Sequence, residues 1–181
     1  MRIAFSGTHR VGKSTLLQHV ADALPRHATV EEPYDLLEEE GYECSEPPSL
    51  EDFEAQLARS LLTLQENQRD VLFDRCPVDV LAYLLVHVDA AAFELEAWTE
   101  RTREAMRTLD LVVFVPVEER DRIALSAQED HEFRLAVHEK LHDLLIEDVL
   151  GLEMEVLTVQ GDTRSRVEQV LARIGGGPHR S

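Results

Sequence analysis

Short apolar runs alternate along this chain with longer stretches in which apolar and polar residues mix at helical spacing. The runs are four or five residues long, which is the usual length of a strand. The uninterrupted run that begins at Leu111, Leu-Val-Val-Phe-Val, is typical of a strand that is buried on both faces of a parallel sheet. We therefore predict five strands, at residues 2–6, 28–31, 71–74, 111–115 and 155–159.

The stretches between these strands predict helices. Pro25 ends the first of them, and Ser49 with Asp52 three residues later is an N-cap signature. Pro77 suits the first position of another helix, because its missing N–H has no helical partner there. The expected helices cover residues 13–24, 34–41, 49–69, 77–88, 94–109, 129–150 and 164–174.

Strands that alternate with helices form a parallel sheet with helices on both faces. The pattern thus predicts an α/β fold of three layers around a five-stranded parallel sheet. No repeat, linker or low-complexity block divides the chain, so we expect a single domain over residues 1–174. The glycines that follow predict a flexible tail at residues 175–181.

Composition and charge exclude several classes of protein. The chain has no apolar stretch long enough to cross a membrane and no signal peptide, so we expect a cytoplasmic protein. Cys44 and Cys76 form no disulfide framework, and we expect reduced thiols. The formal net charge of −18 opposes binding to nucleic-acid backbones and to anionic membranes. A local cluster of amides and arginines can still bind a small anion.

Residues 7–14, Gly-Thr-His-Arg-Val-Gly-Lys-Ser, match the phosphate-binding loop pattern G-x-x-x-x-G-K-[ST] between a predicted strand and a predicted helix. The two glycines allow the backbone to approach phosphates, and successive amides with the positive end of the helix form an anion site. The lysine reaches the β- and γ-phosphates, and the serine hydroxyl can coordinate Mg²⁺. We predict that ATP or a close relative binds through Gly7, Thr8, His9, Arg10, Val11, Gly12, Lys13, Ser14 and Thr15.

This phosphate-binding loop, or P-loop, occurs in several classes of enzyme. The positions of the lysines exclude one of these classes. Guanine-specific GTPases carry an Asn/Thr-Lys-x-Asp element, and only two of the 18 basic residues are lysines. Lys140, the only lysine besides Lys13, lies in the middle of a predicted helix, so that element is absent. Large oligomeric ATPases need a longer chain with a C-terminal helical domain, for which 181 residues leave little room.

Three further segments resemble the nucleoside and nucleotide kinases, in particular deoxynucleoside kinases, thymidylate kinases and the nicotinamide-riboside kinase type. Small bacterial proteins of this shape are often labelled as AAA-family ATPases. The first segment, Val-Glu-Glu-Pro at 30–33, resembles the strand-end Glu-Pro of deoxynucleoside kinases, whose Glu is the general base toward the acceptor hydroxyl. This resemblance implies that role for Glu32, with Glu31 as the alternative.

The second segment, Asp-Arg-Cys at 74–76, resembles the Asp/Glu-Arg-Ser motif of these kinases, with Cys76 in place of Ser. The resemblance implies that Asp74 holds Mg²⁺ together with Ser14, and that Arg75 binds the acceptor or the transferred phosphate. The helix that carries Phe53, Gln56 and Arg59 resembles their substrate-binding helix, but its spacing to Asp74 is shorter.

The third segment, residues 118–134, lies where these kinases carry an arginine-bearing lid. The resemblance implies that Arg120, Arg122 and Arg134 close over the phosphates and stabilise charge in the transition state. The turn at 160–164, Gln-Gly-Asp-Thr-Arg, lies where these kinases contact adenine through the backbone, and a simple turn is the alternative.

Several of these residues also have a purely structural interpretation. Glu32 could be a solvated acid, Asp74 and Arg75 could form a structural ion pair, and the lid arginines could lie on the surface. Asp79 could sit in the first turn of its helix, where the dipole favours an acid. Aromatic side chains near the motifs could stack on an acceptor ring or pack in the core: Tyr34, Phe53 and Tyr83.

Residues 138–142, His-Glu-Lys-Leu-His, spell the H-E-x-x-H pattern of zinc proteases on a predicted helix. Lys140 and Asp143 place charges where such helices are usually uncharged, and no third ligand follows at the expected spacing. A helix that follows a parallel sheet also differs from the architecture of zinc proteases. We therefore treat the pattern as a chance match.

The sequence therefore predicts a P-loop phosphotransferase that uses ATP and Mg²⁺. Its acceptor is a small molecule, a nucleoside or nucleotide, that takes the γ-phosphate on a hydroxyl or a phosphate. The main alternative is a P-loop ATPase or nucleotide-sensing protein without an acceptor, and the net charge disfavours a kinase for nucleic-acid ends. The oligomeric state stays open, a homodimer included.

Overall fold

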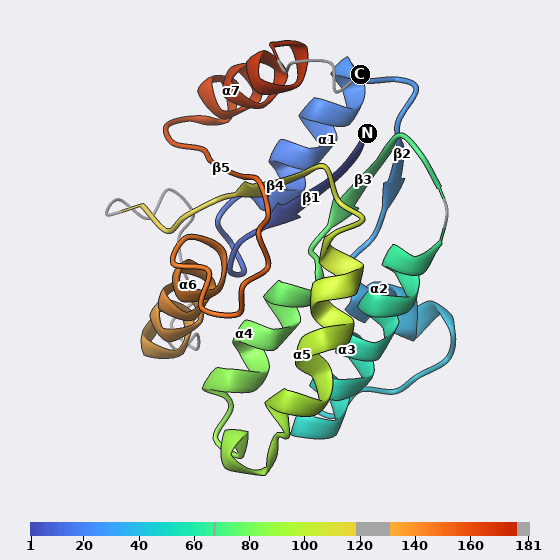
Figure 1. The fold of residues 1–181 in the computed structure, drawn as a ribbon, viewed down its shortest axis with the longest axis vertical. Helices are drawn as coiled ribbons and strands as arrows, with labels where there is room; N and C mark the ends of the chain where they lie inside the picture. Colours follow the sequence, from blue (N-terminus) through green and yellow to red (C-terminus); the bar gives the residue numbers. More distant parts are fainter. Residues whose placement is uncertain (67, 119–130, 177–181) are drawn as a thin grey trace.

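The computed structural model of the protein describes residues 1–66, 68–118 and 131–176. Its sheet has five parallel strands in the order β2-β3-β1-β4-β5 (Figure 1). The strands are β1 (Arg2–Ser6), β2 (Ala28–Val30), β3 (Val71–Asp74), β4 (Leu111–Phe114) and β5 (Val156–Thr158). The predicted α/β fold with a five-stranded parallel sheet is confirmed.

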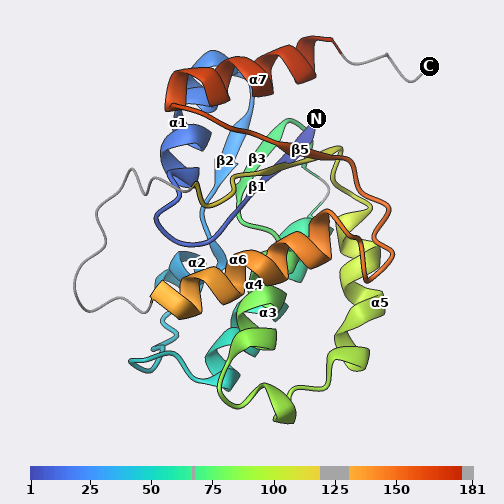
Figure 2. The same ribbon diagram turned by 90° about the vertical axis from the view of Figure 1, so that its left-hand side faces the viewer.

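Helices cover both faces of this sheet. The α-helices of the described residues are α1 (Lys13–Ala23), α2 (Pro33–Glu39), α3 (Leu50–Gln65), α4 (Pro77–Val86), α5 (Leu95–Met106), α6 (His131–Leu145) and α7 (Thr163–Gly175). A short 3₁₀ turn at Ala90–Ala92 precedes α5. Helices α1 and α7 pack against each other on one face, while α3, α4, α5 and α6 form the layer on the other (Figure 1). Seen from the side, α6 lies across α4 (Figure 2).

The alternation of side chains along β1 builds both cores. Ile3 and Phe5 are fully buried in the cluster under α1 and α7, whereas Ala4 belongs to the cluster under the four helices of the opposite face. All four residues of β4 are buried, as the apolar run from Leu111 predicts for an inner strand. No described helix is both long enough and apolar enough to span a bilayer.

Two predicted helices, α3 and α6, end at least four residues before their predicted limits, and α4 (Pro77–Val86) and α5 (Leu95–Met106) end two and three residues early. Helix α3 ends at Gln65 rather than near residue 69, because Glu66 adopts an extended conformation. Helix α6 ends at Leu145 rather than Leu150, because Asp148 takes a left-handed conformation (φ 50°) and closes a turn. Its carboxylate accepts hydrogen bonds from the amides of Leu152 (2.6 Å) and Glu153 (3.0 Å).

The capping box predicted at the start of α3 is present and extends into the preceding loop. Asp52 is 4% exposed, and its carboxylate accepts hydrogen bonds from the Ser49 amide (2.7 Å), the Ser49 hydroxyl (2.8 Å), the Tyr42 hydroxyl (3.0 Å) and the Ser45 hydroxyl. Burial alone would raise the pKa of Asp52, but the hydrogen bonds from Ser45 and Ser49 hold it well below its ordinary value.

We expect Asp52→Asn to lower the free energy of unfolding at pH 7 by about 1–2 kcal/mol, as the loss of a cap does. Because the pKa is lowered in the folded state, Asp52 stabilises the protein fully above the pKa of an unfolded aspartate and less as the pH falls below about 4. Urea unfolding at pH 7 and at about pH 3 measures both effects. Glu51→Gln, an equal charge change at the exposed neighbouring position, is the control. Equal stability of the two variants would contradict this role.

Candidate nucleotide-binding site

The predicted phosphate loop joins the end of β1 to the start of α1. Stereochemistry requires glycine at two of its positions. Gly12 is the N-cap of α1 in a left-handed conformation (φ 83°). Gly7 has a φ of 154°, and a Cβ at this position would lie 2.7 Å from the carbonyl oxygen of Val115 on the adjacent chain segment. A side chain at Gly7 would therefore push the loop away from the sheet.

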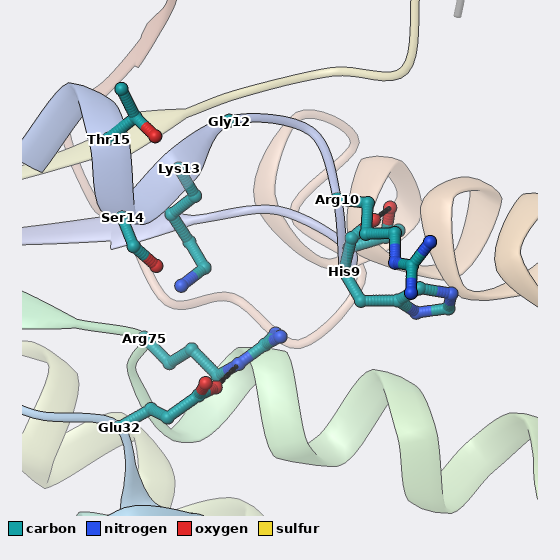
Figure 3. A pocket seen from close by; sticks show the side chains of 9 residues that line it. His9, Arg10, Gly12, Lys13, Ser14, Thr15, Glu32 and Arg75 are labelled. Carbon is teal, nitrogen blue, oxygen red and sulfur yellow. Dashed lines mark hydrogen bonds and ion pairs between the residues drawn. The ribbon is translucent and has the colours of Figure 1, made fainter. Parts of the chain in front are cut away.

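The N-terminus of α1 faces a cavity, and in the described part of the chain no side chain caps it. Its N-cap makes no side-chain hydrogen bond, and its first turn contains no acidic residue. The first amides of a helix have no partner within the helix, so this end can bind an anion. The cavity has a volume of about 250 Å³ and is lined by Thr8, His9, Arg10, Gly12, Lys13, Ser14, Thr15, Glu32 and Arg75 (Figure 3).

Lys13 extends from α1 across this cavity (Figure 3). Its side chain is 5% exposed, and its ammonium group donates a hydrogen bond to the carboxylate of Asp74 at the end of β3. Burial lowers the pKa of Lys13 to about 8, the nearby Arg75 guanidinium contributes to the decrease, and the Glu32 and Asp79 carboxylates oppose it. The ammonium group thus lies where the phosphates of a bound nucleotide would compete with Asp74 for it.

Glu32 and Arg75 form the opposite wall of the cavity (Figure 3). The Nε of Arg75 donates to the Glu32 carboxylate, and its Nη1 donates to the carbonyl of Gly7 at 3.1 Å. Burial alone would raise the pKa of Glu32, but Arg75 and Lys13 lower it, so this carboxylate is ionised at neutral pH. Burial would lower the pKa of Arg75, and Tyr83, Glu32 and Asp79 together raise it, so the guanidinium stays charged.

The parallel sheet explains why these groups meet. Glu32 follows β2, Asp74 ends β3 and the loop follows β1, and these three strands are neighbours in the sheet. The carboxyl ends of parallel strands lie at one edge, where ligands of such sheets bind. Glu31 lies outside the cavity and lines a separate hollow beside β2, so the geometry favours Glu32 as the acid that faces the phosphate loop.

The predicted lid is described only in part. Arg120 and Arg122 lie outside the described residues. Arg134 lies in the first turns of α6 and is 2% exposed, and its Nε donates to the carbonyl oxygen of His9 at 3.2 Å. It contacts the backbone of the phosphate loop and is not among the residues that line the cavity.

Asp79 has a larger role than its sequence position indicates. It lies in the first turn of α4, as the structural interpretation expects, and its Oδ2 accepts a hydrogen bond from the Cys76 amide at 2.9 Å. Its Oδ1 accepts from the Ser6 hydroxyl (3.0 Å) and the Gly7 amide (2.9 Å). This fully buried carboxylate therefore anchors the start of the phosphate loop. The spacing of Asp79 from Cys76 reveals the cap, but nothing local reveals the bond to Gly7.

Tyr83 on α4 connects the loop to a group of aromatic side chains. Its hydroxyl accepts a hydrogen bond from the His9 amide at 3.2 Å, and the Arg75 guanidinium lies 5.4 Å from its ring centre. Phe53 stacks on its ring at 5.6 Å, and Phe133 contacts it at 6.0 Å. All three rings pack against the core on this face of the sheet and remain partly exposed. Tyr34 instead donates to Glu38 on its own helix and lies outside the cavity.

The H-E-x-x-H segment on α6 has an ordinary structural explanation. His138 stacks on the ring of Phe114 at a distance of 5.7 Å, and burial lowers its pKa. His142 is exposed beside Glu147. Among the described residues, no three His, Cys, Asp or Glu side chains come together as metal ligands.

The fold and the loop together define a P-loop protein with a nucleoside- and nucleotide-kinase-like fold. An AAA domain family model matches residues 2–166, so the chain belongs to this family. No curated protein matches the chain in sequence.

Solved structures show the same fold at low identity. Deoxyadenosine kinase from M. mycoides with bound dATP superposes with a TM-score of 0.71 at 17% identity, covering 97% of this chain and 99% of that one. Thymidylate kinase from Candida albicans gives 0.61 at 16% identity over 96% and 90%. The NadR protein in complex with NAD and AMP-PNP gives 0.65 at 19% identity, covering 99% of this chain and 51% of NadR. Identity at this level shows the fold alone.

Proposed function

We propose that this protein is a kinase that transfers the γ-phosphate of ATP, with Mg²⁺, to a small nucleoside-like acceptor. The observation that carries the proposal is the pair of opposing walls in one cavity. The phosphate loop and Lys13 form one wall, and the ion pair of Glu32 and Arg75 forms the other. An ATPase could use the same carboxylate to activate water, so the dependence of ADP formation on an acceptor decides between the two functions.

The first wall would bind the triphosphate. The uncapped amides at the start of α1 and the ammonium group of Lys13 offer the positive charge that the β- and γ-phosphates require. The hydroxyl of Ser14 and the carboxylate of Asp74 are hard oxygen donors of the type that Mg²⁺ prefers, and Lys13 lies next to both. When bound, Mg²⁺ would neutralise charge on the transferring phosphoryl group.

The second wall would orient the acceptor. Glu32 is ionised and held by Arg75, so it can accept the proton of an attacking hydroxyl, while Arg75 stabilises charge on the phosphoryl oxygens. Phosphoryl transfer needs little covalent assistance, and the alignment of acceptor and phosphate supplies most of the catalysis.

The charges on the second wall favour an uncharged hydroxyl as the acceptor over a phosphate. Arg75 already pairs with Glu32 and with the carbonyl of Gly7. Asp35 lies close by, and burial together with Glu32 raises its pKa, which is evidence of crowded acids in the described part of this wall. The partly exposed rings of Phe53 and Tyr83 offer a stacking surface for a flat base.

ADP formation from ATP tests the proposal with a panel of nucleosides, their monophosphates and other small hydroxylated metabolites as acceptors. We expect one or more nucleosides to stimulate ADP formation and to appear as the phosphorylated product by mass spectrometry. We expect the corresponding monophosphates to be poor acceptors. ADP formation at the same rate with and without every acceptor would instead support the ATPase alternative.

A further inference from the structure

Three arginines from separate elements donate hydrogen bonds to alternate carbonyl oxygens of the phosphate loop. The pairs are Arg75 with Gly7 (3.1 Å), Arg134 with His9 (3.2 Å) and Arg166 with Val11 (2.8 Å). The first two arginines belong to motifs of the proposed site. Arg166 lies on α7, 155 positions away from Val11 in the sequence, and does not line the cavity.

Arg166 is held in a buried position by an ion pair. The residue is 8% exposed, and its Nη2 lies 3.0 Å from the Oε1 of Glu118. Its Nε is buried and has no hydrogen-bond partner among the described residues. Burying a guanidinium costs free energy, so the contacts of its two terminal nitrogens account for its place here.

Glu118 extends the connection to a third segment. The same Oε1 accepts a hydrogen bond from the amide of Gly161 at 2.7 Å. Gly161 lies in the turn between β5 and α7, and Glu118 follows β4. Through two side chains, the phosphate loop is therefore tied to both segments that follow the last two strands of the sheet.

The bond from Arg166 also fixes the direction of a loop amide. In a trans peptide the C=O and the following N–H point in opposite directions. Because the carbonyl of Val11 faces Arg166, which does not line the cavity, the amide of Gly12 is directed away from Arg166, and Gly12 does line the cavity. The guanidinium is also close to this peptide, since a Cβ at Gly12 would lie 3.7 Å from its Nη1.

We propose that Arg166 and Glu118 are positioning residues that hold the phosphate loop in the shape that binds a polyphosphate. The proposal rests on nucleotide binding at the loop and not on the identity of the acceptor. Arg166 acts through the backbone of the loop and contacts neither substrate, and Glu118 acts through Arg166 and Gly161.

Titration calorimetry with AMP-PNP and with inorganic tripolyphosphate tests the proposal. We expect Arg166→Gln to weaken the binding of both ligands by about tenfold or more, because both rely on the loop amides. Arg166→Lys should give an intermediate affinity, since an ammonium group keeps the charge and one donor. Glu118→Gln should weaken both ligands as well. Arg173→Gln is the matched control, because Arg173 lies on the same helix and pairs with Glu155.

Thermal unfolding of each variant separates this role from a purely structural one. A variant that unfolds at a lower temperature but binds tripolyphosphate like the wild type would overturn the proposal. A loss of affinity for AMP-PNP without a loss for tripolyphosphate would also overturn it, because the effect would then concern the base. If Arg166→Gln does not fold, Arg166→Lys and Glu118→Gln carry the test. If no compound accepts phosphate in the acceptor screen, the proposed kinase activity is contradicted. The calorimetric titrations would still test the role of Arg166 and Glu118, because they measure only nucleotide and tripolyphosphate binding.

Discussion

Lys13→Ala should lose most of the affinity for ATP and nearly all phosphoryl transfer. The ammonium group lies at the cavity beside Asp74, and a charge-assisted hydrogen bond from it to a phosphate contributes about 1.5–3 kcal/mol, or roughly tenfold to a hundredfold in affinity. Transfer should fall further, by about a thousandfold, because charge on the phosphoryl oxygens grows in the transition state. A direct binding titration and the rate of product formation measure the two effects.

Lys140→Ala is the control for this change, because Lys140 is the only other lysine of the chain. It is partly exposed and pairs with Asp143 at 3.1 Å on the surface of α6. Its removal should change neither binding nor transfer. Unchanged nucleotide affinity in Lys13→Ala would contradict the assignment of the site. It would also contradict the roles proposed for Asp74 and Glu32, because both depend on a nucleotide bound at this loop.

The second large effect is expected from Glu32→Gln. This variant should reduce phosphorylation of the acceptor by about a hundredfold to ten-thousandfold, the range for a lost general base. The affinity for ATP should stay close to that of the wild type, since Glu32 stands on the wall opposite the phosphate loop. Acceptor-dependent transfer and nucleotide titration, measured on the same preparation, separate the two steps.

Glu31→Gln removes the same charge from the neighbouring position, which is exposed and outside the cavity. Glu31→Gln should retain acceptor phosphorylation. If its phosphorylation rate fell as far as that of Glu32→Gln, the assignment of Glu32 as the general base would be contradicted. Because Glu32→Gln also breaks the ion pair with Arg75, its unfolding temperature must be measured alongside. Fast ATP turnover without acceptor, unaffected by Glu32→Gln, would refute the kinase proposal.

The sequence predicts most strands and the phosphate loop because both depend on local patterns. The strand at 111–115 follows from a single apolar run, and the loop from eight consecutive residues. The meeting of Glu32 and Arg75 follows from a general property of parallel sheets together with a family resemblance. The roles of these residues remain predictions that the experiments above address.

The sequence does not predict which distant segments contact one another. The bond between Arg166 and Val11 depends on how α7 packs against α1, and no pattern near residue 166 indicates it. Arg134 looks like a lid arginine in sequence, and only the packing of α6 places it against the carbonyl of His9. Asp79 is a cap by its spacing, and only the pairing of β1 with β3 brings Gly7 within reach of its second oxygen.

The bare amino end of α1 has a practical consequence for handling the protein. The N-cap Gly12 has no side chain and the first turn holds no acid, so the first amides are left to water or to a bound anion. Under the proposed function, cellular nucleotides would occupy this place, and the complex would be more stable toward unfolding than the empty chain. Preparations should therefore be stripped of endogenous ligand before any affinity is measured, since residual occupancy would mask the differences between variants.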